Sequence, residues 1–168
     1  MASTTSMMVL GDLLACAVCE TRGFTERDFA AAHPGGSLGL RLTSVAELMK
    51  TGESIPLIGA EATFKEALKE MNRAKLGVVG VVDADGRLSG IVSDGDVRRF
   101  VSSDAFATDA SVAAAMTRDP KTIEAQQSLQ VALALMEKHK ITVLFALDAE
   151  RRPVGVIHLH SIVEEKVL

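Results

Sequence analysis

Residues 90–96 read Gly-Ile-Val-Ser-Asp-Gly-Asp, and residues 155–161 repeat the pattern as Gly-Val-Ile-His-Leu-His-Ser. The similarity extends outward to residues 45–101 and 112–167, with an offset of 67 residues in the leading segments and 65 in the remainder. Two copies are fewer than the three or more that stacked repeat arrays need. The polar ends differ, because Ser93 becomes His158 and Asp96 becomes Ser161. This inequality predicts a paired scaffold that binds a small ligand asymmetrically.

Composition limits the fold and the partners. The chain has 168 residues, of which 48% are apolar, with six Phe and no Trp or Tyr. These values predict one domain or two small repeats around an aliphatic core. The net charge of −4 and the lack of a basic tract argue against a nucleic-acid surface.

The N-terminal stretch is moderately apolar, but Asp12 interrupts it. No apolar run approaches the ~20 residues that a membrane span needs, so we expect neither a span nor a secretory signal. Cys16 and Cys19 lie in a helical pattern of apolar residues, which favours small buried hydrophobes over a redox or metal pair. Reduced cysteines predict a cytoplasmic protein.

Each copy predicts the same order of elements: strand, helix, strand, strand, helix. Before the copies we expect helices at 7–21 and 25–32, a break at 33–36 and a linker at 37–44. In the first copy we expect a short helix at 45–49, strands at 55–58, 78–82 and 88–92, and helices that begin after Thr63 and at Asp94. The second copy gives the corresponding elements at 112–116, 122–123, 128–139, 142–147, 154–157 and from 159.

These elements make an α/β (α+β) fold with a helical N-terminal segment. A single unit leaves an apolar helix face uncovered, and Ala67 and Met71 with Ala132 and Met136 are candidates to pack there. Two units that face each other would close the core about a pseudo-twofold axis.

The element order and the Gly-apolar-apolar-Ser-x-x-Asp motif at 90–96 resemble the cystathionine β-synthase (CBS) domain, here as a tandem pair. This arrangement is called a Bateman module. The resemblance covers residues 45–168 and implies CBS domains at 45–103 and 110–168. It also implies a homodimer formed through the CBS pair.

The first 44 residues look like the end of a sugar isomerase domain. The motifs are Thr-Thr-Ser at 4–6, Leu-Gly-Asp at 10–12, Arg-Gly-Phe-Thr-x-x-Asp-Phe at 22–29 and His-Pro-Gly-Gly-x-Leu-Gly at 33–39. Joined to a CBS pair, this string is similar to bacterial D-arabinose-5-phosphate isomerases, which act at the head of the Kdo branch of lipopolysaccharide synthesis. Residues 1–36 are then expected to be a remnant of that domain, in a chain cut from a longer enzyme.

Five residues at the end of the predicted strand form the candidate ligand site: Ser93, Asp94, Asp96, Arg98 and Arg99. Backbone donors at the start of a helix favour phosphate, and a carboxylate can accept both hydroxyls of a ribose. The arginines add forked donors for phosphate or carboxylate. The alternative is a capped helix with solvated arginines.

The resemblance also implies a pocket for the base, formed by the first extended segment and the middle strand. The residues at these positions are Thr51, Ile55, Pro56, Gly77 and Val78. Apolar walls would grip the base while backbone groups read its edge.

Three of the four histidines are further candidates for the site. His158 and His160 bracket a strand end and can contact an anionic ligand or serve the structure, but no nearby Cys or carboxylate completes a metal site, so we expect no metal. In the resembling isomerases, the histidine of the His-Pro-Gly-Gly motif is proposed as an acid/base. His33 alone lacks the carboxylates, lysine and phosphate loop of that site, so we expect a remnant that is not active by itself.

The sequence thus predicts a regulatory module that needs no cofactor and is not an enzyme alone. The expected ligand is CMP-Kdo, as end-product feedback, or an adenine nucleotide. Two other interpretations stay open: an architectural pair that binds nothing, and an enzyme that another chain completes at His33. The expected partner is the sugar isomerase domain, in a tetrameric full-length enzyme.

Overall fold

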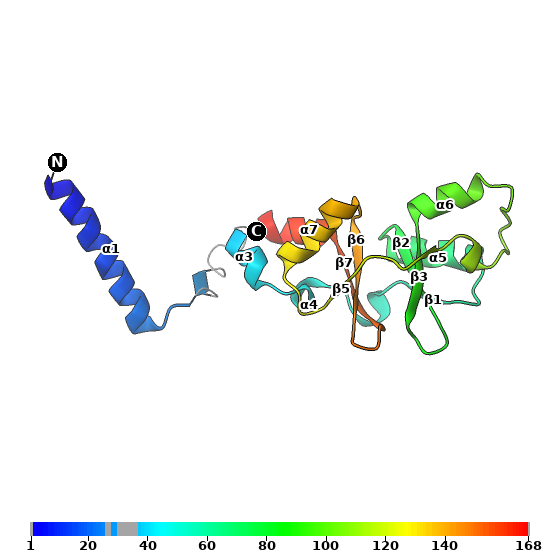
Figure 1. The fold of residues 1–168 in the computed structure, drawn as a ribbon, viewed down its shortest axis with the longest axis horizontal. Coiled ribbons are helices and arrows are strands. Elements are labelled where there is room, and N and C mark those ends of the chain that lie inside the picture. The colour runs from blue at the N-terminus through cyan, green and yellow to red at the C-terminus, as the bar shows by residue number, and fades with distance from the viewer. Residues whose placement is uncertain (1, 26–27, 30–36, 168) are drawn as a thin grey trace.

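The computed structural model describes residues 2–25, 28–29 and 37–167 (Figure 1). Two repeats stand side by side, and the helix α1 (Ala2–Arg22) lies apart from them. The helix α3 (Ser37–Leu42) leads into the first repeat. The elements of that repeat are α4 (Val45–Leu48), the 3-10 turn Gly52–Ser54, β1 (Leu57–Gly59), α5 (Phe64–Ala74), β2 (Val78–Val82), β3 (Leu88–Ser93) and α6 (Asp94–Val101).

The second repeat follows the same order. Its elements are the 3-10 turn Val112–Ala114, β4 (Thr117–Arg118), β5 (Thr122–Glu124), α7 (Leu129–His139), β6 (Val143–Leu147), β7 (Pro153–His158) and α8 (Leu159–Val167). One sheet has the order β1-β2-β3-β4, and the other has the order β5-β6-β7. β1 is parallel to β2 and β5 to β6, whereas β2 is antiparallel to β3 and β6 to β7. The predicted strand-helix-strand-strand-helix unit is confirmed.

Side-chain caps fix where the helices begin. The Thr63 backbone N–H donates to the Glu66 carboxylate at 2.8 Å, and the Glu66 N–H donates back to the Thr63 hydroxyl. Such a capping box satisfies amides that have no partner inside the helix. Ser128 caps α7 in the predicted place, through its hydroxyl and the Val131 N–H.

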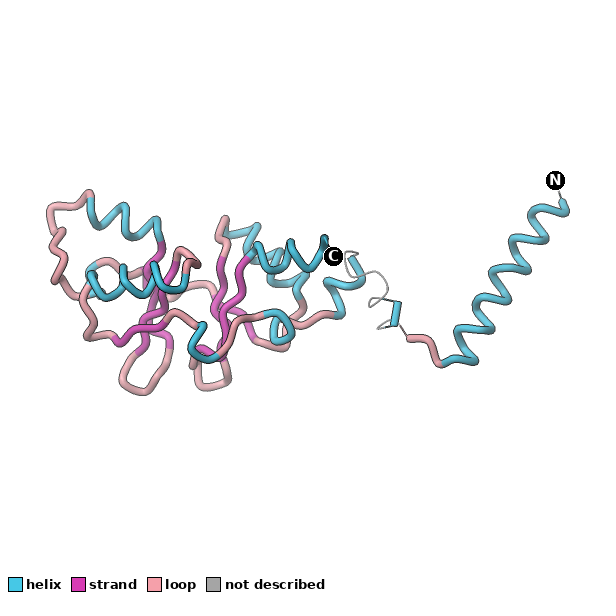
Figure 2. Tube along the Cα trace, turned by 180° about the vertical axis from the view of Figure 1, so that it is seen from behind, coloured by secondary structure: helices cyan, strands magenta, loops and turns pink. Residues whose placement is uncertain are grey.

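The sheets, not the helices, form the core between the repeats. That core contains residues from strands of both repeats and the turns next to them: Ile55, Leu76, Val78, Leu88, Phe145, Leu147 and Val156. The expected helix contact between the repeats is therefore wrong. Ala67 and Met71 pack against their own sheet, as Ala132 and Met136 do in the second repeat. The strands form the contact between the repeats because each sheet has two apolar faces. Its own helices cover one face, and the other repeat covers the second. Figure 2 shows both sheets between the helices of the two repeats.

The leading segment of each repeat, residues 45–50 in the first and 112–118 in the second, packs on the other repeat. Val45 is fully buried in the core of the second repeat, and Val112 in the core of the first. Lys50 and Val156 exchange two backbone hydrogen bonds of 2.9 Å, while β4 pairs with β3. The segment predicted as a linker, 37–44, contains α3, whose apolar Leu40 is buried against the second repeat.

The helix α1 is exposed along its described length. Cys16 and Cys19 are free and exposed, so their predicted burial is wrong within this chain, whose repeats do not cover the helix. Residues 3–22 are also long and apolar enough to cross a membrane by length and composition, contrary to our expectation, because 18 of them reach a mean hydropathy of 1.2 despite Asp12. Helices from the cores of domains have the same properties, so this finding assigns no membrane span. Most of the helix predicted at 25–32 lies outside the described residues.

Candidate functional site

A buried carboxylate lies at the end of β3. Asp96 is 4% exposed and is the one charged side chain among the described residues that is buried. Its carboxylate accepts hydrogen bonds from the Ser93 N–H at 2.8 Å, the Ser93 hydroxyl at 2.5 Å and the Thr117 hydroxyl at 2.7 Å. The Arg99 guanidinium forms an ion pair with it. These partners compensate the buried charge, and the bonds between Ser93 and Asp96 form the helix cap that was predicted as the alternative.

The surroundings keep this carboxylate ionised. Burial alone would raise the pKa of Asp96, but the hydrogen bonds from Ser93 and Thr117 and the charge of Arg99 hold that pKa below its usual range. At neutral pH the site therefore offers a negatively charged acceptor. Two of its donors, the Ser93 N–H and hydroxyl, belong to the capping box that starts α6.

A cavity of about 290 Å³ adjoins the carboxylate. Asp96, Arg99, Phe100 and Ser103 line it on the side of α6, and residues 114–117 line it on the side of the second repeat. This volume is at the small end of ligand sites, which span ~300–1,000 Å³. It suits one moiety of a nucleotide, such as its sugar.

The residues predicted to form a base pocket do not line this cavity: Thr51, Ile55, Pro56, Gly77 and Val78. The Asp94 N–H donates to the Gly77 carbonyl at 3.0 Å, and Gly77 takes a φ of 67°, which favours glycine. The Pro56 carbonyl accepts from the Gly80 N–H at 2.8 Å. Ile55 and Val78 are buried between the sheets.

Thr51 and Arg98 are exposed. The structure therefore joins Ser93, Asp96 and Arg99 in one hydrogen-bonded group. The sequence reasoning missed its fourth member, Thr117. The only sequence feature that could have indicated Thr117 is the difference between the two copies at this position, where the first repeat has Lys50.

The end of β7 has different chemistry. The His158 Nδ1 accepts a hydrogen bond from the backbone N–H of His160 at 3.0 Å. The two imidazole rings stack with their centroids 5.2 Å apart and an angle of 6° between their planes. Burial, the neighbouring His160 and Lys50 lower the pKa of His158 from its ordinary value. Among the described residues no group of three or more His, Cys, Asp or Glu is placed to hold a metal. His33 lies outside the described residues.

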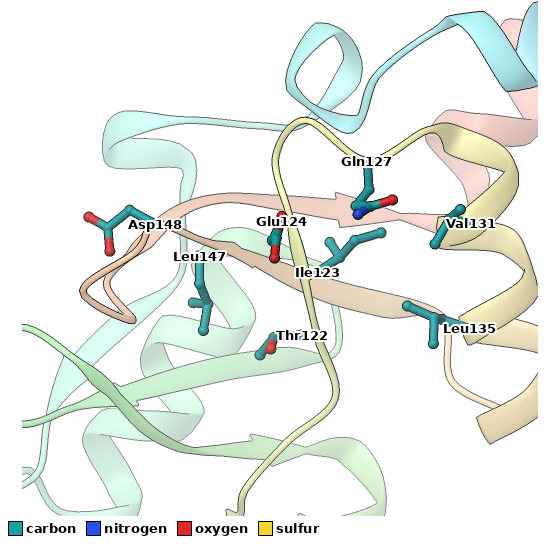
Figure 3. A pocket seen from close by; sticks show the side chains of 8 residues that line it. All are labelled: Thr122, Ile123, Glu124, Gln127, Val131, Leu135, Leu147 and Asp148. Carbon is teal, nitrogen blue, oxygen red and sulfur yellow. The ribbon is translucent and has the colours of Figure 1, made fainter.

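A groove of about 380 Å³ lies between α7 and β5 of the second repeat (Figure 3). Val131 and Leu135 of α7 form one wall, and Thr122, Ile123 and Glu124 of β5 face them. Sequence reasoning missed this groove. The positions that align with Val131 and Leu135 in the first repeat are glutamates, which makes the outer face of α5 charged and that of α7 apolar.

The profile of the CBS domain matches residues 45–103 and 111–167. The chain belongs to the CBS domain family. This confirms the predicted tandem CBS pair.

Two curated relatives narrow the comparison. Arabinose 5-phosphate isomerase KdsD of Pseudomonas aeruginosa is 41% identical over 167 residues, covering 99% of this chain and 51% of the relative. Arabinose 5-phosphate isomerase KpsF of Escherichia coli is 38% identical over 158 residues, covering 94% of this chain and 48% of the relative. The chain thus spans about half the length of the curated relatives it matches. This agrees with the predicted resemblance to the CBS part of such enzymes.

A solved structure supports the fold independently. The crystal structure of CBSX2 in complex with AMP superposes with a TM-score of 0.65 at 21% identity, covering 74% of this chain and 96% of that chain. At this identity the likeness shows the shared CBS-pair fold.

Proposed function

We propose that this CBS pair is the regulatory module of a bacterial D-arabinose-5-phosphate isomerase and binds a nucleotide or nucleotide sugar at Ser93 and Asp96. The observation that carries the proposal is the buried, ionised Asp96 carboxylate beside a cavity. Its donors hold it in place without filling the cavity. The identity to KdsD and KpsF supplies the enzyme class.

The ligand acts by exchanging hydrogen bonds. Two ribose hydroxyls donate to Asp96 in place of Thr117 and Arg99, and the released guanidinium binds a phosphate. Thr117 belongs to the leading segment of the second repeat, which pairs with β3 of the first. Ligand binding therefore changes a contact between the repeats, and this is how it biases the attached isomerase domain.

The ligand that this chemistry favours is CMP-Kdo, the activated end product of the Kdo branch of lipopolysaccharide synthesis. It carries a cytidine ribose, a phosphate and a carboxylate, which match Asp96 and the exposed arginines 98 and 99. Feedback by this compound fits a regulatory module attached to the first enzyme of the branch. AMP is the second candidate, because CBSX2, which shares the fold, was crystallised with AMP.

Isothermal titration with CMP-Kdo, CMP, AMP and ATP tests the proposal. We expect one site per chain, tightest for CMP-Kdo, and an affinity at least ~10-fold lower in Asp96→Asn, because hydrogen bonds to a charged group contribute ~1.5–3 kcal/mol. Asp104→Asn makes the same charge change at an exposed position and serves as the control. No heat with any ligand would favour an architectural pair, and tighter AMP binding would favour the adenine nucleotide.

The same proposal includes assembly, catalysis and location. We propose a cytoplasmic homodimer formed through the CBS pair, within a tetrameric full-length enzyme, and no turnover by this chain alone. Sedimentation equilibrium measures the assembly. Conversion of arabinose 5-phosphate to ribulose 5-phosphate by the purified chain would contradict the last point.

A further inference from the structure

Two methionines fill equivalent notches in the two sheets. The last long strand of each repeat contains a glycine, Gly90 in β3 and Gly155 in β7, and the leading segment of the other repeat places a methionine against it. A Cβ added at Gly90 would lie 2.8 Å from the Met116 Sδ, and one added at Gly155 would lie nearest to the Met49 Sδ. The missing side chain on each strand therefore makes room for a thioether sulfur.

The surroundings of these methionines differ. Met116 is half-buried and lines the cavity beside Asp96. Met49 is also half-buried, but it is not among the residues that line this cavity. Met71 and Met136 are buried inside the repeats, with 6% and 2% of their surface exposed, so a small solute reaches them less readily than it reaches Met116.

We propose that Met116 is a site of reversible oxidation, at which hydrogen peroxide converts the thioether to the sulfoxide and thereby closes the cavity beside Asp96. The sulfur attacks one peroxide oxygen, and an S–O bond forms as the O–O bond breaks. The hydroxide that leaves takes the proton from the transferred oxygen and becomes water. The sulfur loses two electrons, and the peroxide gains them. The product is polar, and methionine sulfoxide reductases reduce it back to the thioether.

Packing decides where the added oxygen goes. The side of Gly90 has no room, because a carbon added to that glycine would already lie 2.8 Å from the sulfur and 2.9 Å from the Thr117 carbonyl oxygen. The open side is the cavity, where the Arg99 guanidinium and the Ser103 hydroxyl can donate to a sulfoxide oxygen. The oxygen therefore takes up part of a space of about 290 Å³ and competes for the guanidinium that pairs with Asp96.

Oxidation of Met116 thus regulates the proposed nucleotide site, and this consequence rests on the proposed function. The sulfoxide takes space that the sugar of the ligand would fill, and it holds the arginine that would bind the phosphate. We expect the oxidised chain to bind nucleotides more weakly. The oxidation itself and the closure of the cavity need no nucleotide, so they can be measured separately.

Peptide mapping by mass spectrometry follows the oxidation of each methionine in the full chain during treatment with hydrogen peroxide. We expect Met116 to be oxidised faster than the buried Met71 and Met136. Dithiothreitol added afterwards reduces disulfides of Cys16 and Cys19 but leaves methionine sulfoxide in place. Equal rates at the three methionines would overturn the proposal.

NMR spectra of the same samples report on the cavity. The backbone amide of Gly90 and the side-chain Nε–H of Arg99 should shift as Met116 is oxidised, and both should return after treatment with methionine sulfoxide reductase. Oxidation of Met116 without these shifts would show that the cavity stays open and would overturn the proposal.

Met116→Leu is the main variant, because leucine is apolar and similar in volume but has no sulfur to oxidise. Peroxide should lower the affinity of the wild-type chain for CMP at least ~5-fold, about the effect of one lost hydrogen bond, and should not change the affinity or the spectrum of Met116→Leu. Met49→Leu removes the sulfur from the equivalent notch and is the matched control, so peroxide should act on it as on the wild type. A response of Met116→Leu equal to that of the wild type would overturn the proposal.

The two kinds of measurement separate this proposal from the nucleotide site. If CMP and the other nucleotides do not bind before oxidation, the proposed function fails, whereas selective oxidation of Met116 with shifts at Gly90 and Arg99 still supports the modification site. If CMP binds equally well before and after full oxidation of Met116, the proposed function stands and the closure of the cavity is refuted.

Discussion

Alanine at Gly155 is predicted to disrupt the contact between the second sheet and the leading segment of the first repeat. A Cβ added there would lie 2.7 Å from the Met49 Cγ, 3.0 Å from its Cε and nearer still to its Sδ. Carbon atoms pack best at ~3.5–4.0 Å, so Met49 must move out of its place. Inserting extra atoms into a packed site costs ~1–3 kcal/mol, and we expect Gly155→Ala to lower the free energy of unfolding by that amount.

The identity of the clashing atoms makes the effect reversible. All three belong to the Met49 side chain, and Met49→Ala removes them. The double variant should therefore be more stable than the sum of the single effects predicts, with a coupling energy of ~1–2 kcal/mol. At the equivalent Gly90 a Cβ meets the Thr117 carbonyl oxygen at 2.9 Å as well as Met116. Backbone cannot be truncated, so Met116→Ala should rescue Gly90→Ala only in small part.

Urea denaturation of the single and double variants measures these energies by linear extrapolation. Gly59→Ala is the control, because a Cβ there meets no atom within 4 Å. If Gly155→Ala destabilises no more than Gly59→Ala, or if the effects of Met49→Ala and Gly155→Ala simply add, the steric argument fails.

Three further predictions concern single positions. Thr117→Val removes a donor to the Asp96 carboxylate and should lower the free energy of urea unfolding by ~1.5–3 kcal/mol; an unchanged value would mean that water replaces the hydroxyl. Gly77→Ala should destabilise more than Gly86→Ala, because both have positive φ but only at Gly77 would the Cβ meet a side chain, at 2.7 Å. In thermal melts, the stability contributed by neutral His158 should be complete above pH 6.5, its ordinary pKa, and be lost as the pH falls through its lowered folded pKa. His158→Gln should flatten this dependence, and an unchanged profile would contradict the assignment.

The repeat and its caps made most of the fold predictable. Thr63 and the strand end at Ser93 mark helix starts by local chemistry that acts within three residues, so no tertiary information is needed. The strand β4 could not be predicted, because two residues carry no periodicity and their pairing with β3 is set by the other repeat. α3 was missed for the same reason, since its burial depends on α7 and is not visible in its own short sequence.

The site was predictable where the repeat could be compared with itself. Ser93 and Asp96 stood out because His158 and Ser161 replace them in the second copy. Thr117 did not, since it is 21 residues from Asp96 and comes close only through the exchange of leading segments. For Cys16 and Cys19 the sequence predicted burial, but both are exposed. An apolar helical pattern indicates a surface that another segment covers, but it does not identify that segment.

The exchange of leading segments links the candidate site to the contact between the repeats. Thr117, which donates to the Asp96 carboxylate, begins the strand that pairs the second repeat with β3. A ligand that displaces Thr117 from Asp96 therefore acts on a contact that also holds the repeats together. If the proposed site is correct, Gly90→Ala should weaken nucleotide binding at Asp96 more than Gly155→Ala does, because the Cβ at Gly90 meets the Thr117 carbonyl oxygen, whereas the Cβ at Gly155 meets only the Met49 side chain. Titrating both variants with CMP measures this, and equal effects of the two variants would contradict the coupling.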